Sequence, residues 1–349
     1  MSLTNFITQL GAAGAGGDAT IAYVPVANAL VAFDCSDPTN LVELGRITDA
    51  TYLVNAQAVV VDVTAQVAYV NGNSYLTSID ISDPTNMSRL DSFADADDAY
   101  GMALDTANSN LYVIAQNTIT LQCIDVSNPS SLSETSILYD ANLDNSRGIA
   151  LDLSTDTLYV GVYDAIVSYD VSNPSSMTRL DAHGTGYYNH YGIGLDTTNN
   201  VAYVSSYGGD RILSINISNP SSMSTLDNYA QTELDGAYGV SLDLDNDVAY
   251  VAGERENSVV SVNISNSSNM SGLDTLKDNT NFAYVNRTAI DVANSVLYVV
   301  AANADALSSI DISSPSSLSI LDTFTFPTEN LIGGIALNID GPNATNAWD

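Results

Sequence analysis

Apolar and polar residues alternate in three kinds of short segment that recur along the chain. Such period-2 alternation, rich in β-branched and aromatic residues, is typical of half-buried strands. The first kind, "AYV" or "LYV", centres on Tyr23, Tyr69, Tyr112, Tyr159, Tyr203, Tyr250 and Tyr298. The second, as in "SIDIS", carries Asp34, Asp80, Asp125, Asp170, Asn216, Asn263 and Asp311. The third, small and apolar as in "GIALD", ends at Asp62, Asp105, Asp152, Asp196, Asp243, Asp291 and Asn338.

The spacing of these segments defines a repeat. Seven copies of the second segment stand 45 to 48 residues apart, and a weaker fourth segment such as "RLDSFAD" follows each copy. Four strands in a period of this length match one blade of a β-propeller. The alternation and the Gly, Asn, Asp and Ser punctuation exclude helical repeats, and a β-solenoid, the alternative, usually has shorter turns. We therefore predict an all-β fold, a seven-bladed β-propeller with four antiparallel strands per blade, over residues 20–340.

The two ends of this region complement each other. The segment "GGIALN" at 333–338 matches the Gly-rich strand that begins a repeat, but the other three strands of that repeat do not follow it. Residues 20–48 contain the other three strands of a repeat, but no Gly-rich strand precedes them. An unpaired inner strand would leave buried backbone groups unsatisfied. We therefore predict that the C-terminal strand pairs with the N-terminal strands and closes the ring. Asn338 stands where the other copies have Asp, and we expect it to cap a turn without the charge.

The repeat resembles two families of propeller repeats. "AYVNGN" at 68–73 and "LYVIAQN" at 111–117 are similar to YVTN repeats, and "IDISDPTNMSRLDSF" at 79–93 is similar to LVIVD repeats. The resemblance covers residues 20–340. It implies a propeller, but it does not imply one function, because such propellers have many roles.

Composition narrows the classes of partner. The net charge is −33, with 41 acidic residues against 8 basic ones, so we expect no nucleic-acid partner. No apolar run is long enough for a membrane span, and the N-terminus does not resemble a signal peptide. Cys35 and Cys123 fall in non-adjacent repeats, so we expect two buried free thiols rather than a disulfide.

Two polar features recur in every repeat: an Asp or Asn at the end of the Gly-rich strand, and a segment that contains Ser, Asp or Asn, and in most copies Pro. The Asp that ends each Gly-rich strand is expected to cap the following turn. The alternative is a ring of Ca²⁺ ligands, because hard cations prefer several oxygen ligands; otherwise we expect no cofactor and no metal. The "S-[DN]-P-[ST]-[NS]" segment is predicted to form one turn of helix between two strands.

The start of each Gly-rich strand should line the mouth of the central channel. The residues predicted to form this ring are Gln57, Tyr100, Arg147, Tyr191, Tyr238 and Asn286, with Gly333 at the seventh position. Aromatic rings, amides and one cation are suited to binding a sugar or a peptide. The alternative is that the tyrosines fill the mouth and hydrogen-bond across it.

The longest variable loop, 181–192, is a second candidate binding site. It contains His183, Tyr187, Tyr188 and His190, and we expect an aromatic contact loop. The alternative is that the two histidines join a carboxylate as metal ligands. The segment "GEREN" at 253–257 is interpreted as a solvated cluster of charges.

No catalytic motif stands out. The chain has no G-x-S-x-G, H-E-x-x-H or P-loop sequence, and the predicted mouth offers no acidic cluster for a metal. We therefore expect a protein that is not an enzyme, with a lactonase-like metal-dependent hydrolase as the less favoured alternative.

Two short segments flank the predicted propeller. Residues 1–19 combine an amphipathic piece, whose apolar residues are Leu3, Phe6, Ile7 and Leu10, with a Gly-Ala linker. Residues 341–349 form a tail that holds the only tryptophan, Trp348. We expect these side chains to dock onto another protein; the alternative is a frayed terminus.

The first residues, "MSLTNF", resemble the N-termini of structural proteins of marine tailed phages. This resemblance implies a virion protein that is assembled in the host cytoplasm, exposed on the particle surface and attached to other virion proteins through residues 1–19. We therefore expect a non-enzymatic tail- or capsid-associated appendage that mediates protein–protein or host-surface contact. The alternative is a module that binds a carbohydrate or receptor, and the two roles are compatible.

Overall fold

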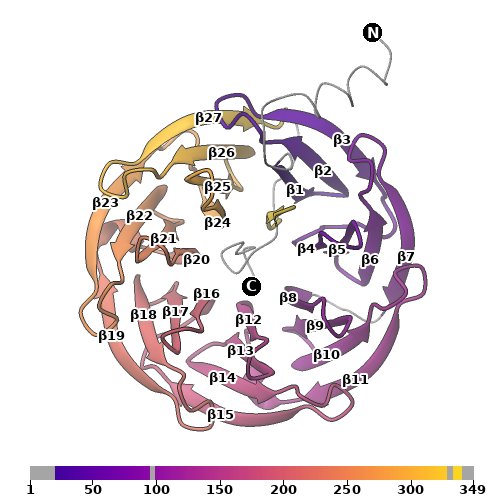
Figure 1. Cartoon of the computed structure of the whole chain (residues 1–349), viewed down its shortest axis with the longest axis horizontal. Coiled ribbons are helices and arrows are strands. Elements are labelled where there is room, and N and C mark those ends of the chain that lie inside the picture. The colour runs from indigo at the N-terminus through magenta and orange to yellow at the C-terminus, as the bar shows by residue number, and fades with distance from the viewer. Residues whose placement is uncertain (1–19, 95–98, 328–332, 340–349) are drawn as a thin grey trace.

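The computed structural model describes residues 20–94, 99–327 and 333–339. These residues form seven four-stranded antiparallel sheets arranged in a ring around a central axis (Figure 1). The predicted fold class, an all-β seven-bladed propeller, is confirmed. The predicted docking residues Leu3, Phe6, Ile7, Leu10 and Trp348 lie outside the described residues.

The first blade contains β1 (Ile21–Val26), β2 (Ala29–Asp34), β3 (Val42–Thr48) and β28 (Ala336–Leu337). Blade 2 has β4 (Ala58–Asp62), β5 (Val67–Asn71), β6 (Tyr75–Asp80) and β7 (Ser88–Ala94). Blade 3 has β8 (Ala99–Asp105), β9 (Asn110–Ala115), β10 (Thr120–Asp125) and β11 (Ser133–Tyr139). Blade 4 has β12 (Ile149–Asp152), β13 (Thr157–Gly161), β14 (Ala165–Asp170) and β15 (Thr178–Gly184).

Blade 5 has β16 (His190–Asp196), β17 (Val201–Ser206), β18 (Arg211–Asn216) and β19 (Ser224–Ala230). Blade 6 has β20 (Ala237–Asp243), β21 (Val248–Gly253), β22 (Ser258–Asn263) and β23 (Ser271–Lys277). Blade 7 has β24 (Val285–Asp291), β25 (Val296–Ala301), β26 (Ala306–Asp311) and β27 (Ser319–Thr325). Two short 3₁₀ helices, η1 (Ala141–Leu143) and η2 (Thr232–Leu234), lie in connections between blades.

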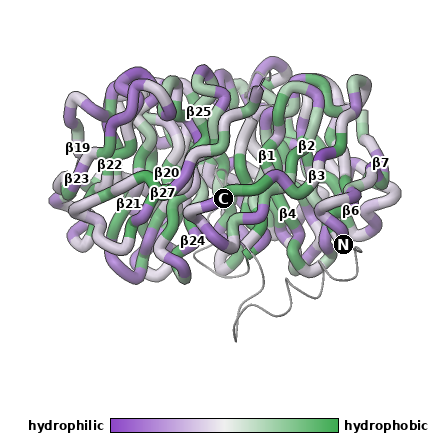
Figure 2. Tube along the Cα trace, turned by 90° about the horizontal axis from the view of Figure 1, so that it is seen from above, coloured by the Kyte–Doolittle hydropathy of each residue, from purple (hydrophilic) through white to green (hydrophobic). Residues whose placement is uncertain are grey.

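The order of strands defines two faces of the ring. Each blade runs from an inner strand outward, so all inner strands begin at one face, which we call the entry face. The entry face also carries the connections between blades and the turns between second and third strands. The opposite face, the exit face, carries the other turns. Seen edge-on, the ring has hydrophobic stretches between two rims where hydrophilic segments are frequent (Figure 2).

The core lies between adjacent blades and is filled by the second and third strands. The seven tyrosines at the centre of the second strands are at most 2% exposed, and burial raises the pKa of each. Three of their hydroxyls donate to a backbone carbonyl of the next blade, as from Tyr203 to Ile264 at 3.3 Å. These side chains therefore hold neighbouring sheets together.

A serine and an aspartate, opposite each other on the two outer strands, link most blades to the next. Ser78 Oγ donates to the carbonyl of Pro129 at 2.6 Å, and the Asp91 carboxylate accepts the N–H of Leu132 at 2.8 Å. We call this arrangement the Ser–Asp pair. It recurs through Ser168 and Asp181, Ser214 and Asp227, Ser261 and Asp274, and Ser309 and Asp322. The repeated "S-[DN]-P" turn therefore serves as the partner of the preceding blade.

Blades 1 and 3 lack the Ser–Asp pair. Blade 1 has Ala32 and Gly45 at these positions, and a Cβ on Gly45 would lie only 2.7 Å from the Pro84 carbonyl oxygen. Blade 3 has Cys123 and Ser136, and there Ser136 Oγ donates to the Pro174 carbonyl. At the first of these junctions the blades therefore meet by direct backbone packing.

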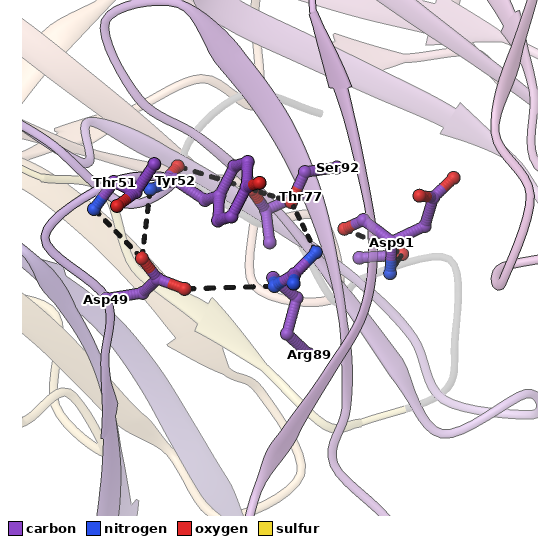
Figure 3. Close-up of polar contacts among 8 residues, drawn as sticks. Asp49, Thr51, Tyr52, Thr77, Arg89, Asp91 and Ser92 are labelled. Carbon is purple, nitrogen blue, oxygen red and sulfur yellow. Dashed lines mark hydrogen bonds and ion pairs between the residues drawn. The ribbon is translucent and has the colours of Figure 1, made fainter.

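At each of these two junctions, an arginine forms an ion pair where the Ser–Asp pair is missing. Arg89 of blade 2 lies 3.7 Å from the Asp49 carboxylate of blade 1 and stacks 4.3 Å from the centre of the Tyr52 ring (Figure 3). At the junction of blades 3 and 4, Arg179 pairs with Asp140 at 3.0 Å. The outer strands are therefore joined by an ion pair where the Ser–Asp pair is missing.

The ring closes as predicted. Ala22 of β1 pairs with Leu337 of β28, and Tyr23 pairs with Ala336. The turn after Asn338, which we predicted this residue to cap, continues beyond the described residues; within them, Asn338 joins the two ends of the ring. Its side-chain oxygen accepts the Ile21 N–H at 2.5 Å, because in this blade the turn between the two strands is replaced by the two ends of the repeat region.

The other local predictions have mixed outcomes. The Asp that ends each inner strand does cap the next turn, as Asp62 accepts the Ala65 N–H at 2.8 Å. The predicted helical turn is wrong: Asp37 accepts the N–H and the hydroxyl of Thr39, so the segment forms a side-chain-stabilised β-turn that leads directly into the next strand. Cys35 and Cys123 are buried free thiols, as predicted.

Candidate functional site

Four of the six predicted mouth residues sit on β-bulges at the start of the inner strands, whereas Gln57 and Arg147 precede β4 and β12. The pairing register shifts at Tyr100, Tyr191, Tyr238 and Asn286, each of which is followed by Gly or by Arg287. A bulge re-aims a side chain and bends the strand. The following glycine is required for close packing: a Cβ on Gly192 would lie 2.3 Å from the Tyr238 carbonyl oxygen of the next blade. In these four blades, the sequence therefore places one large side chain at the start of the inner strand, near the axis (Figure 1).

Three tyrosines of the mouth surround the side chain of Arg147. The Arg147 guanidinium lies 4.6 Å from the centre of the Tyr100 ring and 4.7 Å from that of Tyr191, and its Nη1 donates to the Tyr238 hydroxyl at 2.9 Å. Tyr191 and Tyr238 are buried, and their ring centres are 4.8 Å apart. The tyrosines therefore fill the mouth and bond across it, whereas Arg147 and Tyr100 are only half-buried.

The mouth contains a second cation that the sequence reading did not include. Arg287 is buried, and its guanidinium lies 4.4 Å from the centre of the Tyr238 ring. Burial alone would raise the pKa of Tyr238, but Arg287 and Arg147 outweigh it and hold this pKa below its ordinary value. Arg287 occupies the position where most other inner strands have Gly, and that substitution was the signal that could have revealed it.

The turn between β17 and β18 and the "GEREN" segment extend this cluster. The Tyr207 ring lies 5.2 Å from Tyr191 and stacks under Arg255 at 4.4 Å. Burial, and a hydrogen bond to Glu254, raise the pKa of Tyr207 to about 12. Glu254 is buried, so the expected solvated charge cluster is wrong for this residue, although Arg255 is exposed and pairs with Asp235 at 3.0 Å.

Gln57 and Asn286 occupy equivalent ring positions on either side of the ring closure. Gln57 is half-buried, and its backbone carbonyl accepts the N–H of Gly334 at 2.6 Å. Asn286 is buried, its side-chain oxygen has no hydrogen-bond partner in the structure, and its backbone carbonyl accepts from Arg287. The aromatic and cationic part of the ring therefore belongs to blades 3 to 7.

The variable loop does not bring its two histidines to one site. His183 lies on the outer strand β15 and contacts Thr225, whereas His190 begins the inner strand β16, is fully buried and contacts Thr185 at 2.8 Å. Burial lowers the pKa of His190 to about 4. Within the described ranges, no group of three His, Cys, Asp or Glu side chains is arranged to hold a metal ion.

Of the aromatic residues in the variable loop, Tyr188 lies at the surface and Tyr187 is half-buried. Tyr187 stacks on Arg211 at 3.9 Å from the ring centre. Tyr188 is 50% exposed, and its ring centre lies 5.1 Å from that of Tyr163, which is 47% exposed. This tilted pair forms an accessible aromatic surface.

Exposed tyrosines are confined to the entry face. Six large hydrophobic side chains are exposed in the described part of the chain, and four of them are tyrosines. Tyr139 ends an outer strand, Tyr163 lies in a turn between second and third strands, and Tyr188 and Tyr284 lie in connections between blades. All four positions are on the entry face, whereas Val42 and Leu153 are on the exit face.

The fold and the repeated junctions define the class of the protein as a seven-bladed β-propeller. The LVIVD repeat family matches residues 21–49, 56–95, 101–140, 150–181 and 199–231. The chain therefore contains LVIVD repeats. A comparison with curated proteins found no match.

Several solved structures share the fold at low sequence identity. A Lactobacillus plantarum protein has a TM-score of 0.77 at 14% identity and covers 91% of this chain and 99% of its own. The periplasmic gluconolactonase of Pseudomonas aeruginosa has a TM-score of 0.74 at 11% identity, covering 91% and 98%. A Desulfotomaculum acetoxidans protein of unknown function has a TM-score of 0.73 at 13% identity, covering 91% and 98%. These likenesses show the fold alone. In the described residues, no helix is long and apolar enough to cross a membrane.

Proposed function

We propose that this propeller is a non-enzymatic contact protein and that its entry face is the contact surface. The observation that carries the proposal is the gathering of the exposed tyrosines on that face. Tyrosine supplies a large apolar area and a hydrogen-bonding hydroxyl at low entropic cost, which suits recognition surfaces. The connections on the entry face differ in length and sequence from blade to blade, as contact loops on a rigid scaffold do.

The more specific form of the proposal is a virion appendage attached to a tail or capsid through residues 1–19, with the entry face free for contact. Its support is the phage-like N-terminal sequence. In particles that contain this protein, electron microscopy should show a ring-shaped density joined to its neighbour through the N-terminal segment. A full-length protein that remains a monodisperse monomer and binds no particle protein would contradict this form of the proposal.

A second candidate function is carbohydrate binding on the same face. The observation that favours it is the Tyr163–Tyr188 pair, whose two accessible rings can stack on a sugar. Screening the full-length protein on a glycan array tests it. A signal that disappears in Tyr188→Ala supports sugar binding, whereas the absence of any signal, or one that is indifferent to this change, contradicts it.

A lactonase-like activity is less favoured. It would need a bound metal, and the entry-face mouth offers tyrosine, arginine and amide side chains rather than a carboxylate cluster. A hydrolysis screen on lactones with added divalent ions tests this alternative. Turnover that depends on the metal would replace the non-enzymatic proposal.

A further inference from the structure

The environment of Arg147 is unusual for this acidic chain. Most of its few cations pair with a carboxylate: Arg46 with Glu43, Arg89 with Asp49, Arg179 with Asp140, Arg255 with Asp235 and Lys277 with Glu256. Throughout the described ranges, no ion pair includes Arg147. Among the residues that the structure describes, its guanidinium instead meets aromatic rings and a phenol hydroxyl, and no carboxylate pairs with it.

The geometry fixes this guanidinium in one orientation. Tyr100 and Tyr191 flank it, and one N–H is used by the Tyr238 hydroxyl. Its Nε is buried and has no acceptor within the described part of the chain. A guanidinium has five N–H donors in a planar fork, so donors remain after these contacts. Since Arg147 and Tyr100 are half-buried, the site is not sealed from solvent.

The surroundings favour a small anion with one charge. Arg287 places a second cation against the other side of this cluster, 4.4 Å from the centre of the Tyr238 ring, while Arg147 donates to the Tyr238 hydroxyl. Glu254, hydrogen-bonded to Tyr207, limits the total positive charge, and the chain as a whole carries −33. A multiply charged phosphate is therefore disfavoured relative to a carboxylate, whose planar shape matches the guanidinium fork.

We propose that Arg147, held between Tyr100 and Tyr191 at the channel mouth, binds the carboxylate of a small organic acid. This site is distinct from the exposed tyrosines, and its occupancy does not depend on the macromolecular contact proposed above. Failure of either proposal therefore leaves the other standing.

The test uses full-length protein at low salt and three probes, sodium glucuronate, glucose and sodium acetate, in isothermal titration calorimetry. We expect saturable binding of glucuronate and none of glucose. Arg147→Gln should weaken glucuronate binding by roughly tenfold or more, because the charge-assisted bonds are lost. If acetate binds as tightly as glucuronate, the carboxylate alone is recognised. If acetate binds more weakly, the sugar ring also contributes. Both outcomes support the proposal.

Arg211→Gln is the matched control. Arg211 also stacks on a tyrosine and is in no ion pair with a carboxylate among the described residues, but it lies on the third strand of blade 5, away from the mouth. Its substitution should leave binding unchanged. If Arg147→Gln does not fold, Arg147→Lys replaces it in the test. This variant keeps the positive charge but loses the planar arrangement of N–H donors, so it should also bind glucuronate more weakly than the wild type. Equal binding of glucose and glucuronate, no saturable binding, or equal losses in the Arg147 and Arg211 variants would overturn the proposal.

Discussion

The Asp322 carboxylate of blade 7 accepts the backbone N–H of Leu41 of blade 1 at 2.7 Å, across 281 residues of sequence. The same blade contributes Ser309, which donates to Pro38 at 2.5 Å. The junction that closes the ring is therefore built like the junctions inside it. Closure rests on this Ser–Asp pair as well as on the short strand β28.

Replacing Asp322 with alanine should lower the free energy of unfolding by about 1–3 kcal/mol, because the backbone N–H of Leu41 loses its carboxylate acceptor. Urea unfolding followed by circular dichroism measures the change. Asp227→Ala removes the equivalent bond to Met270 inside the ring and should cost a similar amount. A loss in Asp227→Ala without a loss in Asp322→Ala would mean that the ring does not close as described.

Gly192→Ala should disrupt the junction of blades 5 and 6, because the new Cβ would lie 2.3 Å from the Tyr238 carbonyl oxygen. The strain acts on backbone atoms, so we expect a loss of about 1–3 kcal/mol and a lower melting temperature. Gly184→Ala is the control, since nothing lies within 4 Å of a Cβ at that position. Equal melting temperatures for the two variants would contradict the close packing of the mouth.

Acid should destabilise the protein through the buried imidazole of His190. Burial lowers its pKa from 6.5 to about 4, so between these values the unfolded state binds a proton that the folded state does not. Stability is therefore full above about pH 6.5 and falls as the pH drops towards about 4, by about 3 kcal/mol in total. Urea unfolding at a series of pH values measures this slope. His190→Gln should flatten it in this window; a slope that His190→Gln does not alter would contradict the buried neutral imidazole.

Tyr238 should ionise at a lower pH than the other buried tyrosines. Its pKa is lowered by Arg287 and Arg147, whereas burial raises the pKa of tyrosines such as Tyr250. Between its folded and unfolded pKa values, Tyr238 therefore adds stability as the pH rises, while the other buried tyrosines remove stability above about pH 10. Ultraviolet absorbance titration should lose its earliest step in Tyr238→Phe. An unchanged titration in this variant would contradict the convergence of two arginines on this hydroxyl.

The repeat pattern was sufficient to predict the strands, the number of blades and the pairing of β28 with β1. These features follow from local alternation and from the need to satisfy backbone groups, both of which are visible in one sequence. The role of the Ser–Asp pair was not predicted, because its partners lie one repeat away in sequence and meet only when two blades pack. Even so, its register could have been found, since Ser78 and Asp91 have counterparts at the same offset in four other blades.

The candidate site was predicted only in part. Tyr100, Arg147, Tyr191 and Tyr238 do meet, because they share one position in successive repeats. Arg287 was missed because it stands one residue later. Tyr207 was missed, and Glu254 was interpreted as a solvated charge, because both lie in turns between second and third strands rather than at the start of an inner strand. The histidines of the 181–192 loop were separated by the boundary between an outer and an inner strand, which the loop sequence alone did not place.

The central functional claim is that contact is made through the entry face, and a two-face comparison tests it most directly. Particle proteins and glycans are printed on one array, and binding of the wild type, a Tyr163→Ser and Tyr188→Ser double variant, and Leu153→Ser is measured side by side. Leu153 is as exposed as Tyr188, at 52% against 50%, but lies on the exit face. The account predicts that the double variant loses binding and that Leu153→Ser retains it. Binding that survives the double variant, or that is lost equally in Leu153→Ser, would contradict it.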